Sequence, residues 1–344
     1  MWASVDFSIP LLPITQLPID YGKYSTTSIP SSTGGVTLKK KAKQDQLRSQ
    51  KAPRAKTKNV EYAFPPTSQK HKSVKGFTRT VPGSLLFINS FTGAGATARL
   101  DAAGNYTYVG SLSGFSRWTH VVGAPSGGIL FYDANTGNGA TAKLDAAGNY
   151  TFVGSLSGFG NWTHITSANE NGLLFYNAIT GAGATALLDA NGKYTFVSSL
   201  SGFSKWTHVV GTPSGGILFY DATTGNGATA KLDAAGNYTY VAPLSGFGNW
   251  THITSANKNG LLFVNTITGA GATALLDGNG KYTFVSSLSG FSSWTHIVGT
   301  PNGGILFYNG LTGNGATARL DAGGNYAYTA PLTGFGSWTH IVGV

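Results

Sequence analysis

The sequence lacks cysteine entirely and contains a single methionine, so disulfide bridges and thiolate metal sites are excluded. Charged residues make up only 10% of its 344 residues. No apolar run approaches the roughly 18 residues that a membrane-spanning helix needs, and none of the repeated units described below keeps a helical period of useful length. The start, MWASVDFSIP, lacks the features of a secretory signal peptide. We expect no membrane span, and we favour an extracellular location or the surface of a larger assembly.

What the sequence has instead is a repeat. The word Trp-Thr-His recurs every 44 residues. A fixed period of this length is typical of a repeat architecture. The repeated tryptophans are Trp118, Trp162, Trp206, Trp250, Trp294 and Trp338.

Each repeat contains four short runs rich in aromatic and β-branched residues, which favours strands. Residues with a preference for tight turns, such as Asn149 and its neighbouring glycine, separate the runs. Four antiparallel strands in about 44 residues match the blade of a β-propeller. In the unit starting at residue 127 the predicted strands are Ile129–Ala134, Ala140–Asp145, Tyr150–Val153 and Trp162–Thr166.

The two ends of the array predict how the ring closes. The first repeat begins near Leu85 without a Trp-Thr-His strand before it, and the last ends with Trp338–Val344 and nothing after it. Pairing of the last strand with the first would leave no open sheet edge. We therefore predict an all-β fold: a six-bladed propeller over residues 83–344, closed by the C-terminal strand, with each Trp strand nearest the axis.

These repeats resemble bacterial FG-GAP/VCBS-like repeat propellers. The resemblance rests on the Trp-Thr-His strand, the Leu-Phe-Tyr-Asp strand that follows it and the Thr-Gly turn, and it covers residues 83–344. The plan is also similar to propeller lectins of the tachylectin and Photorhabdus type. The resemblance implies a propeller and a binding role. The Asp-rich calcium loops of many such repeats are absent here, since Asp145 is the single carboxylate of its turn.

Residues 1–82 have a different composition. They contain 14 Lys+Arg and 4 Asp+Glu, which leaves 9 of each in the repeats. Prolines interrupt the segment throughout. We predict a separate Pro-rich, basic N-terminal arm, either extended or disordered, that serves as an anchor. A solvated linker and a contact with a protein partner or a polyanion are both open.

Two repeated positions are candidates for ligand binding. The six tryptophans could stack on a sugar, or they could be core residues. The position that ends the Phe-Tyr strand alternates between asparagine and aspartate, and it could bind hydroxyl groups or cap a turn. That second set comprises Asn89, Asp133, Asn177, Asp221, Asn265 and Asn309.

Other repeated residues favour structural roles. The six histidines of Trp-Thr-His belong to different blades and lack companion ligands, so we expect hydrogen bonds and no metal site. The phenylalanine of each Gly-Phe loop is either a plug between blades or an exposed stacking residue. Catalysis needs groups in unlike environments, whereas the repeats give every candidate nearly the same surroundings. We predict no catalytic residues and no cofactor.

The function predicted from the sequence is a multivalent, lectin-like propeller that binds glycans and is displayed by the N-terminal arm, and not an enzyme. Several weak sites on one rigid body raise avidity without any new type of contact. The alternative is a structural or adhesion subunit of a larger assembly, such as a fibre, particle or injection apparatus, docked through residues 1–82.

Overall fold

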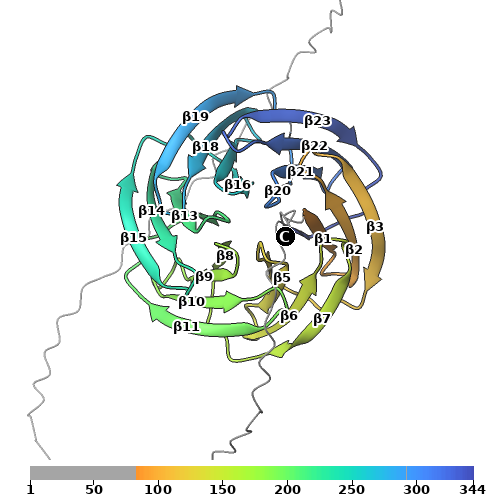
Figure 1. The fold of residues 1–344 in the computed structure, drawn as a ribbon, viewed down its shortest axis with the longest axis horizontal. Coiled ribbons are helices and arrows are strands. Elements are labelled where there is room, and N and C mark those ends of the chain that lie inside the picture. Colours follow the sequence, from red (N-terminus) through yellow and green to blue (C-terminus); the bar gives the residue numbers. More distant parts are fainter. Residues whose placement is uncertain (1–82, 292) are drawn as a thin grey trace, which may run out of the picture. The chain divides into compact units, whose positions relative to one another are not determined.

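The computed structural model describes residues 83–291 and 293–344, and these residues form a ring of six four-stranded antiparallel sheets (Figure 1). Across this described part of the chain all regular structure is β-strand, 24 strands in total. The predicted six-bladed propeller is confirmed. The predicted N-terminal arm, residues 1–82, lies outside the described residues.

The blades are numbered by their order along the chain. Blade 1 contains β1 (Ser84–Ile88), β2 (Ala94–Leu100), β3 (Tyr106–Ser113) and, from the C-terminus, β24 (His340–Gly343). Blade 2 contains β4 (His120–Gly123), β5 (Gly128–Asp133), β6 (Asn138–Leu144) and β7 (Tyr150–Leu156). Blade 3 contains β8 (His164–Ala168), β9 (Gly172–Tyr176), β10 (Gly183–Leu188) and β11 (Tyr194–Leu200).

The second half of the ring repeats this plan. Blade 4 contains β12 (His208–Gly211), β13 (Gly216–Asp221), β14 (Asn226–Leu232) and β15 (Tyr238–Leu244). Blade 5 contains β16 (His252–Ala256), β17 (Gly260–Val264), β18 (Ala270–Leu276) and β19 (Tyr282–Ser289). Blade 6 contains β20 (His296–Gly299), β21 (Gly304–Asn309), β22 (Asn314–Leu320) and β23 (Tyr326–Leu332).

Ring closure follows the prediction. The last strand, β24, pairs antiparallel with β1, so that Phe87 lies opposite Ile341 and Ile88 opposite His340. In every blade the strand that begins with histidine lies nearest the axis (Figure 1). The Trp and Thr of the repeated word precede this strand rather than open it. Thr163 is held just before the ladder by a bond from its N–H to the carbonyl of Tyr176.

The core lies between neighbouring blades. The second strand of each blade is buried along its length, because one blade packs on each of its faces; in β13, Ile217 to Tyr220 are all buried. Burial of apolar surface on this scale is the main stabilising contribution in such a fold. The outermost strand is instead largely exposed, as in β15.

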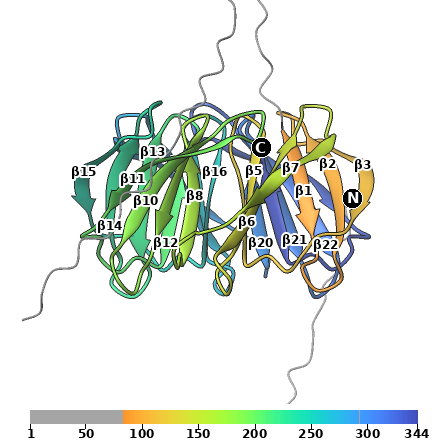
Figure 2. The same cartoon turned by 90° about the horizontal axis from the view of Figure 1, so that it is seen from below.

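The hairpin turns and inter-blade loops gather at the two rims of the ring (Figure 2). One rim, termed here the Trp rim, holds the turn between the second and third strands of each blade and the loop before each Trp. In blade 3 the two are joined, since Asn177 in the turn donates its amide Nδ2–H to the carbonyl of Asn161 in the loop. The Thr-Gly turn requires positive φ, as at Gly225 (φ 69°), which glycine adopts without strain.

Candidate functional site

The tryptophan of each repeat lies at the Trp rim and is half-buried. In blade 4, the ring centroid of Trp206 is 5.7 Å from that of Phe219, in the core. The other five tryptophans pack in the same way against the core of their blades. Each indole thus has one face on the core, and only the remainder is available for a ligand.

The Gly-Phe loop places a second aromatic ring beside each tryptophan. Gly202 has a φ of 85°, which turns the chain inward. Phe203 then lies 5.7 Å from Phe219 and 5.3 Å from Tyr238, measured between ring centroids. Phe203 also lies 5.5 Å from Tyr176 of blade 3, so the phenylalanine is a plug between blades, which resolves the two roles left open by the sequence.

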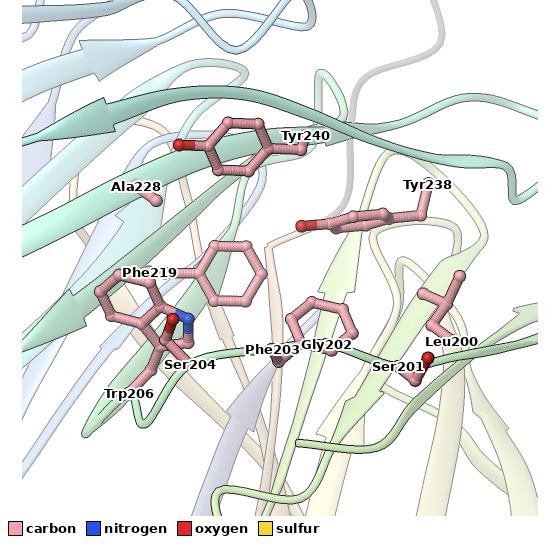
Figure 3. Close-up of a pocket in the computed structure, with 10 residues that line it drawn as sticks. All are labelled: Leu200, Ser201, Gly202, Phe203, Ser204, Trp206, Phe219, Ala228, Tyr238 and Tyr240. Atoms are coloured by element: carbon pink, nitrogen blue, oxygen red, sulfur yellow. The ribbon is translucent and has the colours of Figure 1, made fainter.

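These aromatic residues line a groove in blade 4 (Figure 3). One pocket of about 260 Å³ and a second of about 460 Å³ share Ser204, Trp206, Ala228 and Tyr240. Tyr240 is 54% exposed and forms the outer wall. The full lining is aromatic and small polar: Leu200, Ser201, Gly202, Phe203, Phe219, Asn226, Gly227, Tyr238, Pro243, Leu244 and Ser245 complete it.

A buried tyrosine in the preceding blade fixes the position of four of these loops, whereas Ile88 and Val264 occupy the equivalent position before the other two. The hydroxyl of Tyr176, in blade 3, donates to the carbonyl of Ser204 and accepts the backbone N–H of Trp206 at 2.9 Å. Tyr220 does the same for the next loop, at the carbonyl of Gly248 and the N–H of Trp250. This role was not predictable from the sequence, because the partners lie 28 to 30 residues apart and in different blades. The available signal was a tyrosine that follows the Phe at the end of the second strand in four of the six repeats.

The asparagines predicted to bind ligand are engaged in their turns. The Oδ1 atom of Asn177 accepts the backbone N–H groups of Ile179 and Thr180, while its Nδ2 donates to the neighbouring loop. Asn89, Asn265 and Asn309 repeat this arrangement.

The aspartates at the same position use their carboxylates within the turn. Asp221 accepts the hydroxyls of Thr223 and Thr224, both at 2.7 Å, and Asp133 accepts that of Thr136 at 2.7 Å. Hydrogen bonds from these threonine hydroxyls are the main cause of the lowered pKa of each carboxyl. The structure thus brings the tryptophans and this polar set to one rim, and a ligand role for either set stays a prediction.

The histidines form a closed circle around the axis. His208 places Nε2 at 3.2 Å from the carbonyl of Thr251 in the next blade, and the other five repeat the contact. A nitrogen that faces a carbonyl oxygen must donate, so Nε2 carries the proton. The Nδ1 atom of His208 lies 2.9 Å from the hydroxyl of Thr207. Both ring nitrogens are occupied, which agrees with a structural role and leaves neither free as a base.

Four histidines of this circle have a pKa below the ordinary value. Burial lowers the pKa of His208, and the neighbouring histidines lower it further, against a smaller opposing effect of the Thr251 carbonyl. Burial is also the main cause of the lowered pKa of His164, His296 and His340. Among the described residues, no group of three or more His, Asp or Glu side chains could hold a metal ion.

Comparisons with known proteins establish the fold. No protein-family profile matches the chain, and no curated protein matches it in sequence. A candidate 6-phosphogluconolactonase from Bacteroides uniformis has a TM-score of 0.53 at 10% identity, over 77% of this chain and 100% of that one. A protein of unknown function from Desulfotomaculum acetoxidans has a TM-score of 0.50 at 10% identity, over 74% and 80%. The periplasmic gluconolactonase of Pseudomonas aeruginosa has a TM-score of 0.46 at 13% identity, over 76% and 99%.

These findings correct the predicted function. A solved propeller of this shape bears a lactonase name, which contradicts both the glycan-binding prediction and its structural or adhesion alternative. The prediction that the chain is not an enzyme is contradicted by the same finding, since that solved propeller is named as an enzyme. At 10% identity the likeness establishes the fold and assigns no activity. In the part of the chain that is described, no helix is long and apolar enough to cross a membrane.

Proposed function

We propose that the groove of blade 4 binds a small, uncharged ligand with a flat apolar face. The observation that carries the proposal is the aromatic lining of the groove, where Trp206 and Tyr240 flank an open space (Figure 3). Aromatic faces offer a ligand a large apolar contact at a small entropic cost. The groove contains no charged side chain, so neither a cation nor an anion gains an ionic partner there.

Polar groups in the groove can also form hydrogen bonds that orient a bound ligand. Within the described residues, no hydrogen bond involves the indole N–H of Trp206, so it is a donor for the ligand. The hydroxyls of Ser201 and Ser204 lie in the same groove. A few polar groups in a mainly apolar pocket are what small-molecule sites commonly have, and the volume suits a small molecule.

The repeat extends the proposal to the other blades. The position of Tyr240 is aromatic and exposed in every blade: Tyr108, Phe152, Phe196, Tyr240, Phe284 and Tyr328. The Pro243 position differs, since it is serine in four blades and proline only in blades 4 and 6. In blade 1 the hydroxyl of Tyr108 is bound to Ser111 at 2.6 Å, which ties the ring to its own strand. We expect the grooves of blades 4 and 6 to bind alike, and differently from the rest.

Two finer assignments also belong to this proposal. The kinship with FG-GAP/VCBS-like repeats is supported by the repeated Trp-Thr-His strand and Thr-Gly turn. The division into a basic arm, residues 1–82, and a neutral ring, residues 83–344, is supported by the distribution of charge, with protein or polyanion contacts assigned to the arm.

The test is a ligand-observed NMR screen of the full-length protein with uncharged aromatic fragments. Tyr240→Ala should weaken binding of a hit about tenfold, whereas Val241→Ala, its exposed neighbour on the same strand, should leave the affinity unchanged. Equal binding by wild type and Tyr240→Ala, or the absence of any hit, would overturn the proposal.

The same sample should be incubated with a gluconolactone, because a solved propeller of this shape bears a lactonase name. Turnover that Tyr240→Ala reduces and Val241→Ala does not would make the groove an active site. Turnover unaffected by Tyr240→Ala would place any chemistry elsewhere in the ring.

A further inference from the structure

The six blades are not equivalent at the Trp rim. Four hairpin turns carry a large apolar residue at the tip, and these side chains are between 77% and 90% exposed. They are Phe91 in blade 1, Ile179 in blade 3, Ile267 in blade 5 and Leu311 in blade 6. The tips of blades 2 and 4 are polar instead, Asn135 and Thr223. Exposed apolar side chains grouped on one surface usually mark an interaction site.

Charge follows the same division. Among the described residues in the turns and loops of this rim, the charged ones are Arg117 and Asp133 in blade 2 and Lys205 and Asp221 in blade 4. Each of these two blades therefore has one cation and one anion. The four blades with apolar tips have asparagine in place of the aspartate, with asparagine or serine before the Trp. Three positions thus change together from blade to blade.

The order of the blades around the ring fixes where the apolar and the charged turns lie relative to one another. Neighbouring innermost strands follow chain order around the axis, and β24 lies beside β4 (Figure 1). The rim is therefore apolar, charged, apolar, charged, apolar, apolar from blade 1 to blade 6. The turns of each rim end at similar heights along the axis of the ring (Figure 2).

We propose that the Trp rim is the contact surface between two copies of this chain, stacked face to face about a twofold axis through blades 3 and 6. Such an axis places blade 2 on blade 4 of the partner, blade 1 on blade 5, and blades 3 and 6 on themselves. Every apolar tip then meets an apolar tip. No other twofold axis in the plane of the rim pairs the two charged blades with each other and not with apolar ones.

Charge complementarity supports the second copy as the occupant. In this register blade 2, with Arg117 and Asp133, faces blade 4 of the partner, with Lys205 and Asp221, so that each of the two facing blades brings one cation and one anion. A self-complementary patch of this kind is what a twofold contact between identical chains requires. Opposed charges at the contact also disfavour other registers, in which they would face apolar tips.

Sedimentation of the full-length protein is the first test. We expect a species of twice the 35.7-kDa chain mass at micromolar concentration. Leu311→Glu places two like charges near the axis and should raise the dimer Kd about a hundredfold. The matched control, Ala146→Glu, adds the same charge to an exposed turn of the other rim and should leave the Kd unchanged.

Cysteine cross-linking tests the register, and the chain has no cysteine of its own to interfere. Leu311→Cys and Ile179→Cys should each cross-link alone, because those blades meet their own copies. Ile267→Cys should cross-link poorly alone and efficiently when mixed with Phe91→Cys. Thr223→Cys should likewise cross-link poorly alone and efficiently when mixed with Asn135→Cys.

Three results would overturn the proposal. One is a wild-type protein that stays monomeric up to its solubility limit. Another is cross-linking at similar rates for all positions, which would indicate random collision. The third is a monomer that co-sediments with phosphatidylcholine vesicles and loses this property in Leu311→Glu, which would assign the apolar tips to a lipid surface.

Discussion

Each blade has two sheet edges, and the innermost and outermost strands are protected from further strand pairing in different ways. The innermost strand is short, and a histidine of the neighbouring blade binds the backbone carbonyl just before it. For example, His208 of blade 4 binds the carbonyl of Thr251, which precedes the innermost strand of blade 5. The outermost strand carries a register shift in every blade, such as that between Thr229 and Ala230 opposite β15. A bulge of this kind deters pairing with another sheet. The comparison teaches that closure protects the inner edge, while local distortion protects the outer one.

An added methyl group should reduce the free energy of unfolding more on the innermost strand than on the outermost strand. A Cβ atom at Gly211, on β12, would lie 2.1 Å from the carbonyl oxygen of Ser167 in the adjacent blade, so the backbone would have to move. Gly154, on the outermost strand β7, has nothing within 4 Å of the same atom. We expect Gly211→Ala to reduce the free energy of unfolding by about 3 kcal/mol and Gly154→Ala by less than about 0.5 kcal/mol. Urea unfolding of both variants checks the contrast, and equal losses would contradict it.

Removal of one link of the histidine circle should have the next largest effect. His208→Ala leaves the carbonyl of Thr251 without its side-chain donor, at an expected loss of about 1–2 kcal/mol. His208→Gln keeps an N–H donor and should recover part of this loss. Thermal unfolding measures both variants at pH 7.5, and an alanine variant as stable as wild type would show that the circle contributes nothing.

Acid should weaken the inner edge before the rim turns. Burial lowers the pKa of His208 and His296 in the folded ring, while the unfolded chain keeps the ordinary value of about 6.5. As the pH falls below 6.5, these histidines therefore bind protons in the unfolded state before they do so in the folded state. The free energy of unfolding decreases over the interval between 6.5 and the lower pKa values of the folded ring.

The turn carboxylates respond only at lower pH. A hydrogen bond from the Asn149 side chain is the main cause of the lowered pKa of Asp145, so the stability that this turn provides is lost below about pH 4.

For the histidines, we expect the Tm to fall between pH 7.5 and pH 5.5 in wild type, and less steeply in His208→Gln. Identical slopes for the two proteins would argue against a contribution from this histidine.

The smallest expected effect concerns the outer edge. Thr229 has a buried hydroxyl oxygen without a hydrogen-bond partner, because Ala242 lies opposite it on β15. In blade 3 the equivalent Thr185 is bound to Ser198 at 3.0 Å. Ala242→Ser should therefore stabilise the ring by about 0.5–1 kcal/mol, and Ser198→Ala should destabilise it by a similar amount. A double mutant that combines the two would show whether the effects add, and the same sign for both single variants would refute the explanation.

Much of the architecture was predictable, because the repeat displays its own boundaries. The period of 44 residues, the turn glycines and the alternating apolar runs locate four strands per unit, and the unpaired ends of the array predict the β24–β1 pairing. Local errors remain at strand ends. The innermost strand of blade 3 begins at His164 and not at Trp162, because its first partner is Tyr176.

The candidate site was predicted in part. The tryptophans do lie at one rim with the Asn/Asp positions, yet the outer wall of the groove, Tyr240, was not among the predicted residues. Exposure cannot be read from an alternating strand whose neighbours are unknown. The link from Tyr176 to the Trp206 loop was also missed, since it joins two blades that the sequence shows only as consecutive repeats.

The sequence by itself determined the number of blades, the strand order within each blade and the way the ring closes, because these follow from a local pattern copied six times. Only the tertiary structure decided which face of each repeated side chain is buried, which carbonyl each histidine reaches, and where the aromatic residues leave a groove open. Those features depend on distances between neighbouring blades, and such distances arise only when the ring is assembled.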